Sequence, residues 1–240
     1  MKIRRKSMAL TIIALMVGAV LILGLAQLGR GAGAGKSAAQ GQKHDNFVLL
    51  IDQSNEMNLP YGSKALKKSV IARQLANSFV KGVPDKIPVK GGIYMYGILA
   101  KNPSNTVIRV LKVQGFNREQ FEDTIKNRIK DQTGPSSLSW ALKMVKDDLG
   151  QVPGRTAVII LSGGNKSDPG KPSQEAAALK KAYGPRVCIY TIYIGKNKDE
   201  ARFLKGLVDD GRCGIALNAD SVDDDAVMRK FARSVFFNTL

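Results

Sequence analysis

The sequence predicts an α/β fold: a Rossmann-like three-layer domain over residues 46–240, with a mostly parallel central sheet, one short antiparallel edge strand and helices on both faces. Short apolar runs alternate with segments whose apolar residues recur at helical spacing. Several runs are continuously apolar, as in parallel strands that are buried on both faces. A short turn joins two of the runs, which indicates an antiparallel pair, because parallel strands need a longer crossover.

The individual elements follow in order along the chain. The first strand is predicted at 47–51, directly before Asp52, and a helix is predicted from about Ser63. Strands at 91–100 and 107–113 are joined by the turn-prone sequence Asn-Pro-Ser-Asn and form the antiparallel edge. The remaining predictions are helices at 117–129 and 136–149, a strand at 156–161, a helix near 173–183, a strand at 187–194, a helix near 199–208, a short strand at 214–217 and a helix from about 222.

The N-terminal segment is apolar from residue 8 to residue 28 and follows a cluster of basic side chains at 2–6. At 1.5 Å per residue it spans about 30 Å, enough to cross a bilayer core. We predict that 1–28 is a single transmembrane anchor or, alternatively, a signal peptide cleaved near 32–34. The basic cluster should stay in the cytoplasm, which places the domain in the periplasm or outside the cell, or secretes it after cleavage.

Residues 29–45 are rich in Gly, Ala, Ser and Gln and are predicted to be a flexible linker. Gly35-Lys36-Ser37 resembles the end of a phosphate-binding loop, but the first glycine of that motif would fall on Arg30. The only histidine, His44, is also assigned to the linker, which leaves no Ser-His-Asp or Cys-His arrangement in the domain. We therefore predict a binding protein and not an enzyme.

The formal net charge of +17 is shared between the N-terminal segment and the predicted domain. Residues 1–45 contain seven basic and one acidic side chain, and the rest of the chain contains thirty basic and nineteen acidic ones. A basic domain favours anionic partners such as lipid headgroups or acidic cell-wall polymers. Because there is no Arg-rich helix and no strand that alternates basic and aromatic residues, we predict no nucleic-acid partner.

Polar side chains follow the first strand, at the edge of the sheet where ligands of open α/β domains bind. Asp52, Ser54 and Glu56 alternate along this loop, and Ser136 lies in a second loop that opens a helix. Short oxygen side chains in such a loop suit a hard cation such as Mg²⁺. A third loop, after the strand 156–161, should converge on the same edge.

This arrangement resembles the von Willebrand factor type A (VWA) family and its metal-ion-dependent adhesion site (MIDAS). The family's first motif is Asp-x-Ser-x-Ser, which is followed by a Thr in a Gly-rich turn and by an Asp after a central strand. Asp52 and Ser54 match the first motif, and Ser136 stands at the Thr position. Glu56 replaces the second Ser, and Gly163 replaces the last Asp.

The resemblance covers about residues 46–238 and includes the order of the elements and the antiparallel edge. It implies the predicted fold and a function in adhesion or protein interaction. In that family a carboxylate of the ligand often completes the coordination of the metal. The resemblance therefore implies a protein partner that binds at the loops around Asp52 and Ser136.

Two interpretations of the altered site are open. In the first, Glu56 restores the negative charge lost at Gly163, and Asp52, Ser54, Glu56 and Ser136 hold Mg²⁺ in a rearranged site. In the second, the site has lost its metal, and Asp52 and Ser54 cap backbone amides at a turn. The second interpretation leaves a basic envelope protein that docks on anionic lipid or cell-wall polymer without a metal.

The two cysteines, Cys188 and Cys213, lie in and just before predicted strands that flank one helix. A right-handed crossover between these strands could place the two side chains next to each other. A disulfide in an oxidising compartment would then add about 3 kcal/mol of stability. The alternative is two buried thiols. Two cysteines alone cannot complete a four-ligand zinc site.

Overall fold

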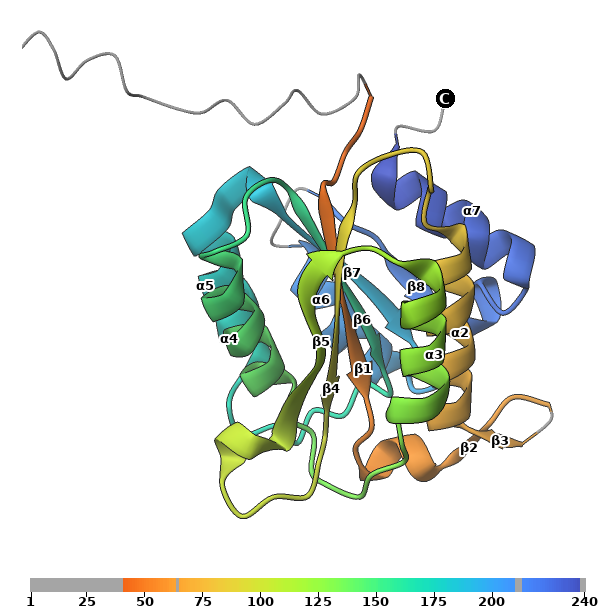
Figure 1. Cartoon of the computed structure of the whole chain (residues 1–240). Helices are drawn as coiled ribbons and strands as arrows, with labels where there is room; N and C mark the ends of the chain where they lie inside the picture. The colour runs from red at the N-terminus through yellow and green to blue at the C-terminus, as the bar shows by residue number, and fades with distance from the viewer. Residues whose placement is uncertain (1–40, 64, 210–212, 238–240) are drawn as a thin grey trace, which may run out of the picture. The chain divides into compact units, whose positions relative to one another are not determined.

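The computed structural model describes residues 41–63, 65–209 and 213–237. Within them, a six-stranded sheet with the order β5-β4-β1-β6-β7-β8 lies between two layers of helices (Figure 1). In this sheet β5 runs antiparallel to β4, and the other neighbours pair in parallel. The strands are β1 (Asn46–Asp52), β4 (Lys90–Tyr96), β5 (Val107–Gly115), β6 (Thr156–Ser162), β7 (Val187–Tyr193) and β8 (Ala216–Asn218). The predicted fold class is confirmed.

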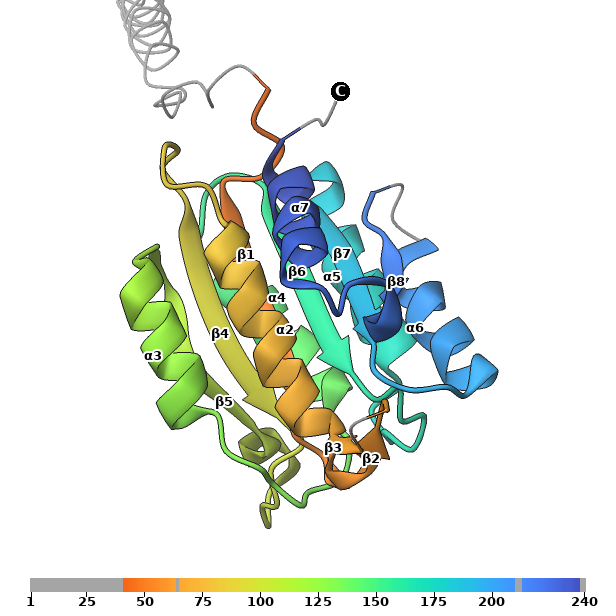
Figure 2. The ribbon, with the colours of Figure 1, turned by 90° about the vertical axis from the view of Figure 1, so that its right-hand side faces the viewer.

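The helices cover both faces of the sheet (Figure 2). They are α2 (Lys68–Gly82), α3 (Arg118–Arg128), α4 (Leu138–Leu149), α5 (Pro172–Tyr183), α6 (Lys198–Asp209) and α7 (Asp225–Phe236). Helices α2, α3 and α7 pack on the face that carries Phe47 and Leu49, and α4, α5 and α6 pack on the face that carries Val48 and Leu50. Because successive side chains of a strand point to opposite faces, β1 contributes to both cores and is buried throughout.

Residues at the N-terminal boundary determine where several helices begin. Asn117 Oδ1 accepts a hydrogen bond from Gln120 N (2.9 Å) at the start of α3. Asp224 Oδ1 accepts hydrogen bonds from two backbone amides at the start of α7. Pro172 opens α5, where its missing amide hydrogen costs nothing because the first turn of a helix leaves such groups unpaired.

Helix α2 begins later than the sequence predicted. The prediction started it at about Ser63, whereas the structure starts it at Lys68. Between β1 and α2 the chain forms the 3-10 helix η1 (Asn55–Asn58) and an antiparallel pair of two-residue strands, β2 (Pro60–Tyr61) and β3 (Leu66–Lys67). Strands of this length contain too few residues to show an alternating pattern.

Residues 42–45 lie in the folded domain, although the composition of 29–45 predicted a flexible linker. His44 is 3 % exposed, its Nδ1 lies 2.6 Å from Val235 O, and its ring packs edge-on against Tyr190. Gln42 pairs with Phe237 in an isolated β-bridge. These two contacts could not be predicted from the sequence, because the partners of His44 and Gln42 lie at the C-terminal end of α7, far away along the chain.

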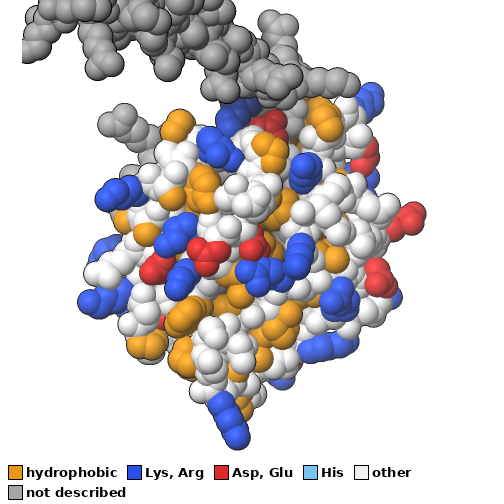
Figure 3. All heavy atoms as spheres, turned by 60° about the vertical axis from the view of Figure 1, so that its left-hand side comes forward, with side chains coloured by type: hydrophobic (Ala, Val, Ile, Leu, Met, Phe, Trp, Pro, Cys, Tyr) orange, Lys and Arg blue, Asp and Glu red, His pale blue; other side chains and the backbone are white. Residues whose placement is uncertain are grey.

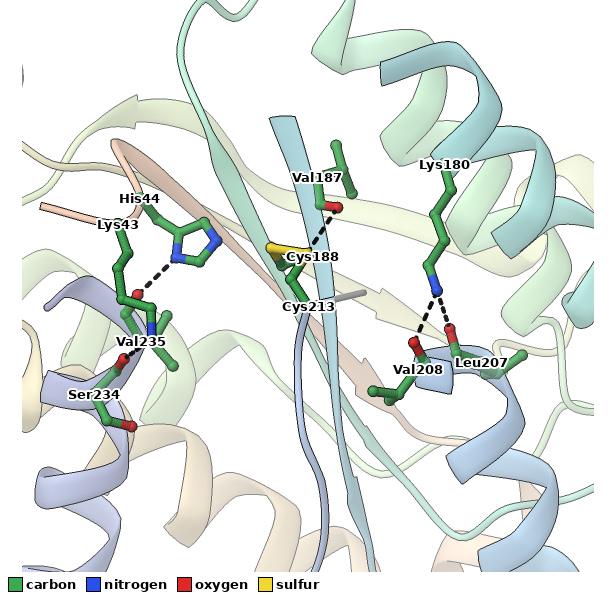
Figure 4. The surroundings of a disulfide bond; sticks show 10 residues. All are labelled: Lys43, His44, Lys180, Val187, Cys188, Leu207, Val208, Cys213, Ser234 and Val235. Carbon is green, nitrogen blue, oxygen red and sulfur yellow. Dashed lines mark hydrogen bonds between the residues drawn. A yellow bond between two sulfur atoms is a disulfide. The ribbon is translucent and has the colours of Figure 1, made fainter. Parts of the chain in front are cut away.

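Cys188 in β7 and Cys213 before β8 form a disulfide in the structure, with their Cα atoms 5.2 Å apart (Figure 4). In the same region, Lys180 of α5 donates hydrogen bonds to the backbone oxygens of Leu207 (2.8 Å) and Val208 (3.1 Å) in α6. These contacts tie the last turns of α5 and α6 together beside the disulfide. That the disulfide forms in the cell stays a prediction, because it depends on the redox state of the compartment.

The apolar segment 8–28 and the sequence Gly35-Lys36-Ser37 lie outside the described residues. Among the described residues, no helix combines the length and the apolar composition that crossing a membrane requires. The anchor, the signal peptide and the rest of the linker therefore stay predictions.

Candidate functional site

The candidate site lies at the C-terminal edge of the parallel strands. From β1 the chain moves to β4 and β5 on one side and then returns to β6 on the other side, so the strand order reverses at β1. Ligands of open α/β sheets bind at such a point. Asp52 ends β1, Tyr96 is its partner at the end of β4, and Ser162 ends β6. The register therefore places three polar side chains in one row.

The Asp52 carboxylate is fully buried in this row. Its Oδ1 accepts a hydrogen bond from Ser54 N (2.9 Å), and its Oδ2 accepts one from Ser162 Oγ (2.8 Å). Burial raises the pKa of Asp52, and the groups of Ser54, Ser162 and Gly163 offset that increase only in part. In the part of the chain that the structure describes, no basic side chain forms an ion pair with Asp52.

Ser54 Oγ is also buried and has no hydrogen-bond partner among the described residues. It lies near enough to the Asp52 carboxylate to help lower the pKa of that group, but without the geometry of a hydrogen bond. Leaving a buried hydroxyl unpaired costs about 1–3 kcal/mol. Among the residues that the structure describes, the site thus contains an acidic group without a cation and a hydroxyl without a partner.

Two glycines allow the surrounding loops to approach the Ser54 loop. A Cβ added at Gly97, where φ is +83°, would lie 2.4 Å from Ser54 N, and one added at Gly134 would lie 2.3 Å from the carbonyl carbon of Ile98. Asn55 N donates to Gly134 O (2.9 Å), and Gly134 N donates to Gly97 O (3.1 Å). These backbone contacts join three loops into one unit.

Ser136 lies in the same loop as Gly134 and is 4 % exposed. The next residue, Ser137, fixes the loop, since its Oγ accepts a hydrogen bond from Gly97 N (2.9 Å) and donates one to Thr106 O (3.2 Å). The loop that carries Ser136 is therefore held against the loop that carries Asp52 and Ser54, as the sequence predicted for this edge.

Glu56 lies over Gly163. A Cβ added at Gly163 would lie 2.9 Å from Glu56 Cγ, so the Glu56 side chain fills the space that a side chain at 163 would need. The Glu56 carboxylate forms an ion pair with Lys68 Nζ at the start of α2. The side chains of Lys68 and Glu56 are 9 % and 22 % exposed. The structure brings Glu56 to the altered position of the motif, but it also pairs Glu56 with Lys68, a cation that the sequence pattern did not predict there.

Three further side chains were missed: Tyr96, Ser162 and Asp168. Burial raises the pKa of Tyr96 well above its ordinary value, and the charge of Asp52 is the next largest cause. Asp168, in the loop after β6, accepts hydrogen bonds from Ser139 N and Ser139 Oγ (both 2.7 Å) and so fixes the first turn of α4. Strand register and loop closure place these residues at the site, and neither can be read from spacing in the sequence.

The residues present fit a divalent cation in part. Asp52, Ser54 and Ser136 offer carboxylate and hydroxyl oxygens, which are the ligands that Mg²⁺ prefers, and a cation would pair both the Asp52 charge and the Ser54 hydroxyl. Glu56 fits less well, because Lys68 holds its carboxylate. Within the described ranges, no three His, Cys, Asp or Glu side chains are grouped so that they could hold a metal ion.

Solved structures with the same arrangement of strands and helices include a bacterial adhesin. The pilus adhesin SpaC from Lactobacillus rhamnosus GG matches with a TM-score of 0.61 and 14% identity over 82% of this chain and 31% of that chain. A von Willebrand factor type A structure from Catenulispora acidiphila matches with a TM-score of 0.52 and 13% identity over 82% and 45% of the two chains. Proximal thread matrix protein 1 from the mussel byssus, with a zinc-occupied MIDAS motif, matches with a TM-score of 0.51 and 16% identity over 81% and 48%.

No family model and no curated protein matches the sequence. The chain matches less than half the length of each of the three structures, and the low identities limit the likeness to the fold. The sheet order, the antiparallel edge strand and the two helical layers agree with the fold that the motifs of the first and second loops predicted. The described domain of this chain therefore has the von Willebrand factor type A fold.

Proposed function

We propose that the domain is a non-enzymatic protein-interaction or adhesion module that binds its partner through the loops around Asp52 and Ser136. The observation that carries this proposal is the buried Asp52 carboxylate beside the unpaired Ser54 hydroxyl, at the point where the strand order reverses. Buried polar groups are normally paired, so a site that leaves two of them without a full set of partners indicates a ligand. A pilus adhesin shares this fold.

The ligand that fits these groups is a divalent cation such as Mg²⁺. Asp52, Ser54 and Ser136 would hold it, and Glu56 lies at the same edge. When bound, the cation would supply positive charge at the buried carboxylate and a coordination position for an oxygen of the partner. A zinc-occupied MIDAS motif in a mussel protein of the same fold supports a metal of this kind.

We further propose that the domain faces the periplasm or the cell exterior, anchored by residues 8–28 or secreted after their cleavage. The apolar length of this segment and its basic N-terminal flank support that placement. The disulfide between Cys188 and Cys213 fits an oxidising compartment. The similar adhesin comes from a pilus, which is a surface structure.

Metal titration of the full chain in detergent micelles tests the metal site. We expect isothermal titration with Mn²⁺ or Mg²⁺ to give saturable binding at or below millimolar concentration, and Ser54→Ala to weaken that binding at least about tenfold, because Ser54 is a direct ligand. Ser104→Ala is the matched control, since Ser104 is exposed in the turn between β4 and β5. Absence of heat with the wild type at millimolar metal would contradict the metal site.

A second candidate function is metal-independent docking on anionic lipid or cell-wall polymer. Lys68 already neutralises Glu56, and basic side chains outnumber acidic ones in the domain. Figure 3 shows Lys and Arg distributed over the face that it presents, not gathered in one patch. Co-sedimentation with anionic vesicles separates the two functions: charge-driven docking weakens as salt rises and ignores chelator, whereas metal-bridged binding is abolished by chelator.

A further inference from the structure

The charge of Lys68 lies in an unfavourable environment, and its ion pair with Glu56 compensates for this. It is the first residue of α2, where the helix dipole is positive and a cation is disfavoured. Its side chain is only 9 % exposed, so its ammonium group has also lost most of its hydration. Among the described residues, Glu56 is the acidic side chain that pairs with it. Glu56 is therefore the described partner that offsets both costs at Lys68.

The ion pair lies where a metal site of this fold would need its acidic ligand. Glu56 folds over Gly163, the position at which the resemblance puts an aspartate, and the unpaired Ser54 Oγ belongs to the same loop. A divalent cation held by Asp52 and Ser54 would attract the Glu56 carboxylate. Lys68 opposes this in two ways, because it holds the carboxylate and because its own charge repels a second cation nearby.

We propose that Lys68 competes with the divalent cation for Glu56 and thereby sets the metal affinity of the site. This inference rests on the proposed metal site. In the lysine-bound arrangement, Glu56 is neutralised from within the chain and the site binds metal weakly. When a cation enters at Asp52 and Ser54, Glu56 exchanges Lys68 for the metal. Lys68 is thus a residue that sets the affinity of the site, not a ligand.

The experiment compares Lys68→Met with Lys67→Met. Both substitutions remove one positive charge from adjacent positions, but Lys67 is half-exposed and pairs with Asp131, so it serves as the matched control. Mn²⁺ titration of the full chain in detergent micelles should give binding at least about tenfold tighter for Lys68→Met than for Lys67→Met, because Glu56 is released. The double variant Glu56→Gln/Lys68→Met should lose that gain.

Folding is checked by a second measurement on the same variants. If Lys68→Met proves unstable without metal, Lys68→Gln takes its place, and the shift of the melting temperature with added Mn²⁺ reports binding to the folded state. We expect that shift to be larger for the Lys68 variant than for the wild type and for Lys67→Met. Equal shifts in the three proteins overturn the inference.

The outcomes separate this inference from the proposed function. If the wild type binds metal and the Lys68 variant binds it no more tightly than Lys67→Met, the inference fails and the metal site stands. If the wild type is silent and the Lys68 variant binds, the proposed metal site fails in the native protein, and the inference stands in the form that Lys68 closes the site. If neither protein binds Mn²⁺, both are overturned. A gain that persists in Glu56→Gln/Lys68→Met also overturns the inference, because Glu56 would not be the contested group.

Discussion

The two ends of the central sheet differ in how well their buried side chains are paired. At the start of the parallel strands, the Phe47 ring packs among four other phenylalanine rings, and a disulfide joins Cys188 to Cys213. At the other end of β1, Asp52 is buried without a cation and Ser54 Oγ has no described partner. The first end is dominated by contacts that stabilise the fold, although Gln42 Oε1 there also has no described partner, and the other end carries groups that cost stability.

The stabilising end and the polar end both belong to the single strand β1. Phe47 has room because its neighbour on β4 is Gly91, where an added Cβ would lie 2.5 Å from the ring. Truncating such a ring costs about 3–5 kcal/mol, whereas an unpaired buried hydroxyl costs about 1–3 kcal/mol. The stabilisation from the aromatic end is therefore larger than the cost of the polar groups, so the fold can keep these groups for binding.

Phe47→Ala should have the largest effect on stability. Removing the ring leaves a cavity among the four surrounding rings and should lower the free energy of unfolding by about 3–5 kcal/mol. Denaturant unfolding followed by circular dichroism measures the change. Val227→Ala is the control, because Val227 is exposed and its truncation should change stability by less than about 0.5 kcal/mol. A loss below about 1 kcal/mol for Phe47→Ala would contradict the role assigned to this end.

Removing the disulfide tests the same end of the sheet. The double variant Cys188→Ser/Cys213→Ser should lose about 3 kcal/mol, because the bridge closes a chain segment with a sequence separation of 25 and so restricts the unfolded chain. Adding reductant to the wild type should reproduce the loss and should leave the double variant unchanged. Alkylation of both cysteines in the folded wild type without reductant would show that the bridge does not form.

The order of the elements could be predicted from the sequence, but the partners at the site could not. The continuous apolar run before Asp52 and the short link between two apolar runs predicted the type of sheet and its antiparallel edge. The first of these two strands ends at Tyr96 and not near residue 100, and the link to β5 contains the 3-10 helix η2 (Pro103–Thr106). Lys68 was missed because its partner Glu56 is on a different element, outside any helical spacing. His44 was predicted to lie in the linker because the residues around it are polar, and its backbone partner in α7 is far away in the sequence. Such contacts depend on register and loop closure, which a single sequence does not display.

Asp52→Asn should stabilise the metal-free protein at neutral pH, because it removes a buried charge that forms no ion pair among the described residues. Burial raises the pKa of Asp52 in the folded state, so wild-type stability falls as pH rises from below the unfolded pKa through the folded pKa. Asp52→Asn should lack this dependence. Denaturant unfolding in chelator across acidic and neutral pH measures both effects, and lower stability of the variant at neutral pH would contradict the assignment.

Asp131→Asn should have the smallest effect and the opposite sign. Asp131 accepts hydrogen bonds from Arg73 Nη1 (2.6 Å), Ser69 Oγ (2.9 Å) and Lys67 Nζ (3.0 Å). Burial alone would raise the pKa of Asp131, but these three partners outweigh it and lower the pKa to about 2. Because the pairs are partly exposed to solvent, the variant should lose less than about 1 kcal/mol at neutral pH.

The contributions of Asp131 and Asp52 to stability should change with pH in opposite directions. The folded pKa lies below the ordinary value of 3.8, so the stabilisation from Asp131 is present above that value and is lost as pH falls towards about 2. The gap between wild type and Asp131→Asn should therefore close on acidification, while Asp52→Asn should lose its advantage over the wild type in the same direction. Wild-type, Asp52→Asn and Asp131→Asn unfolding curves at several pH values test both. If the two variants showed parallel pH profiles, the Asp52 carboxylate would be paired to the same degree as the Asp131 carboxylate. The Asp52 carboxylate would then no longer indicate a bound cation.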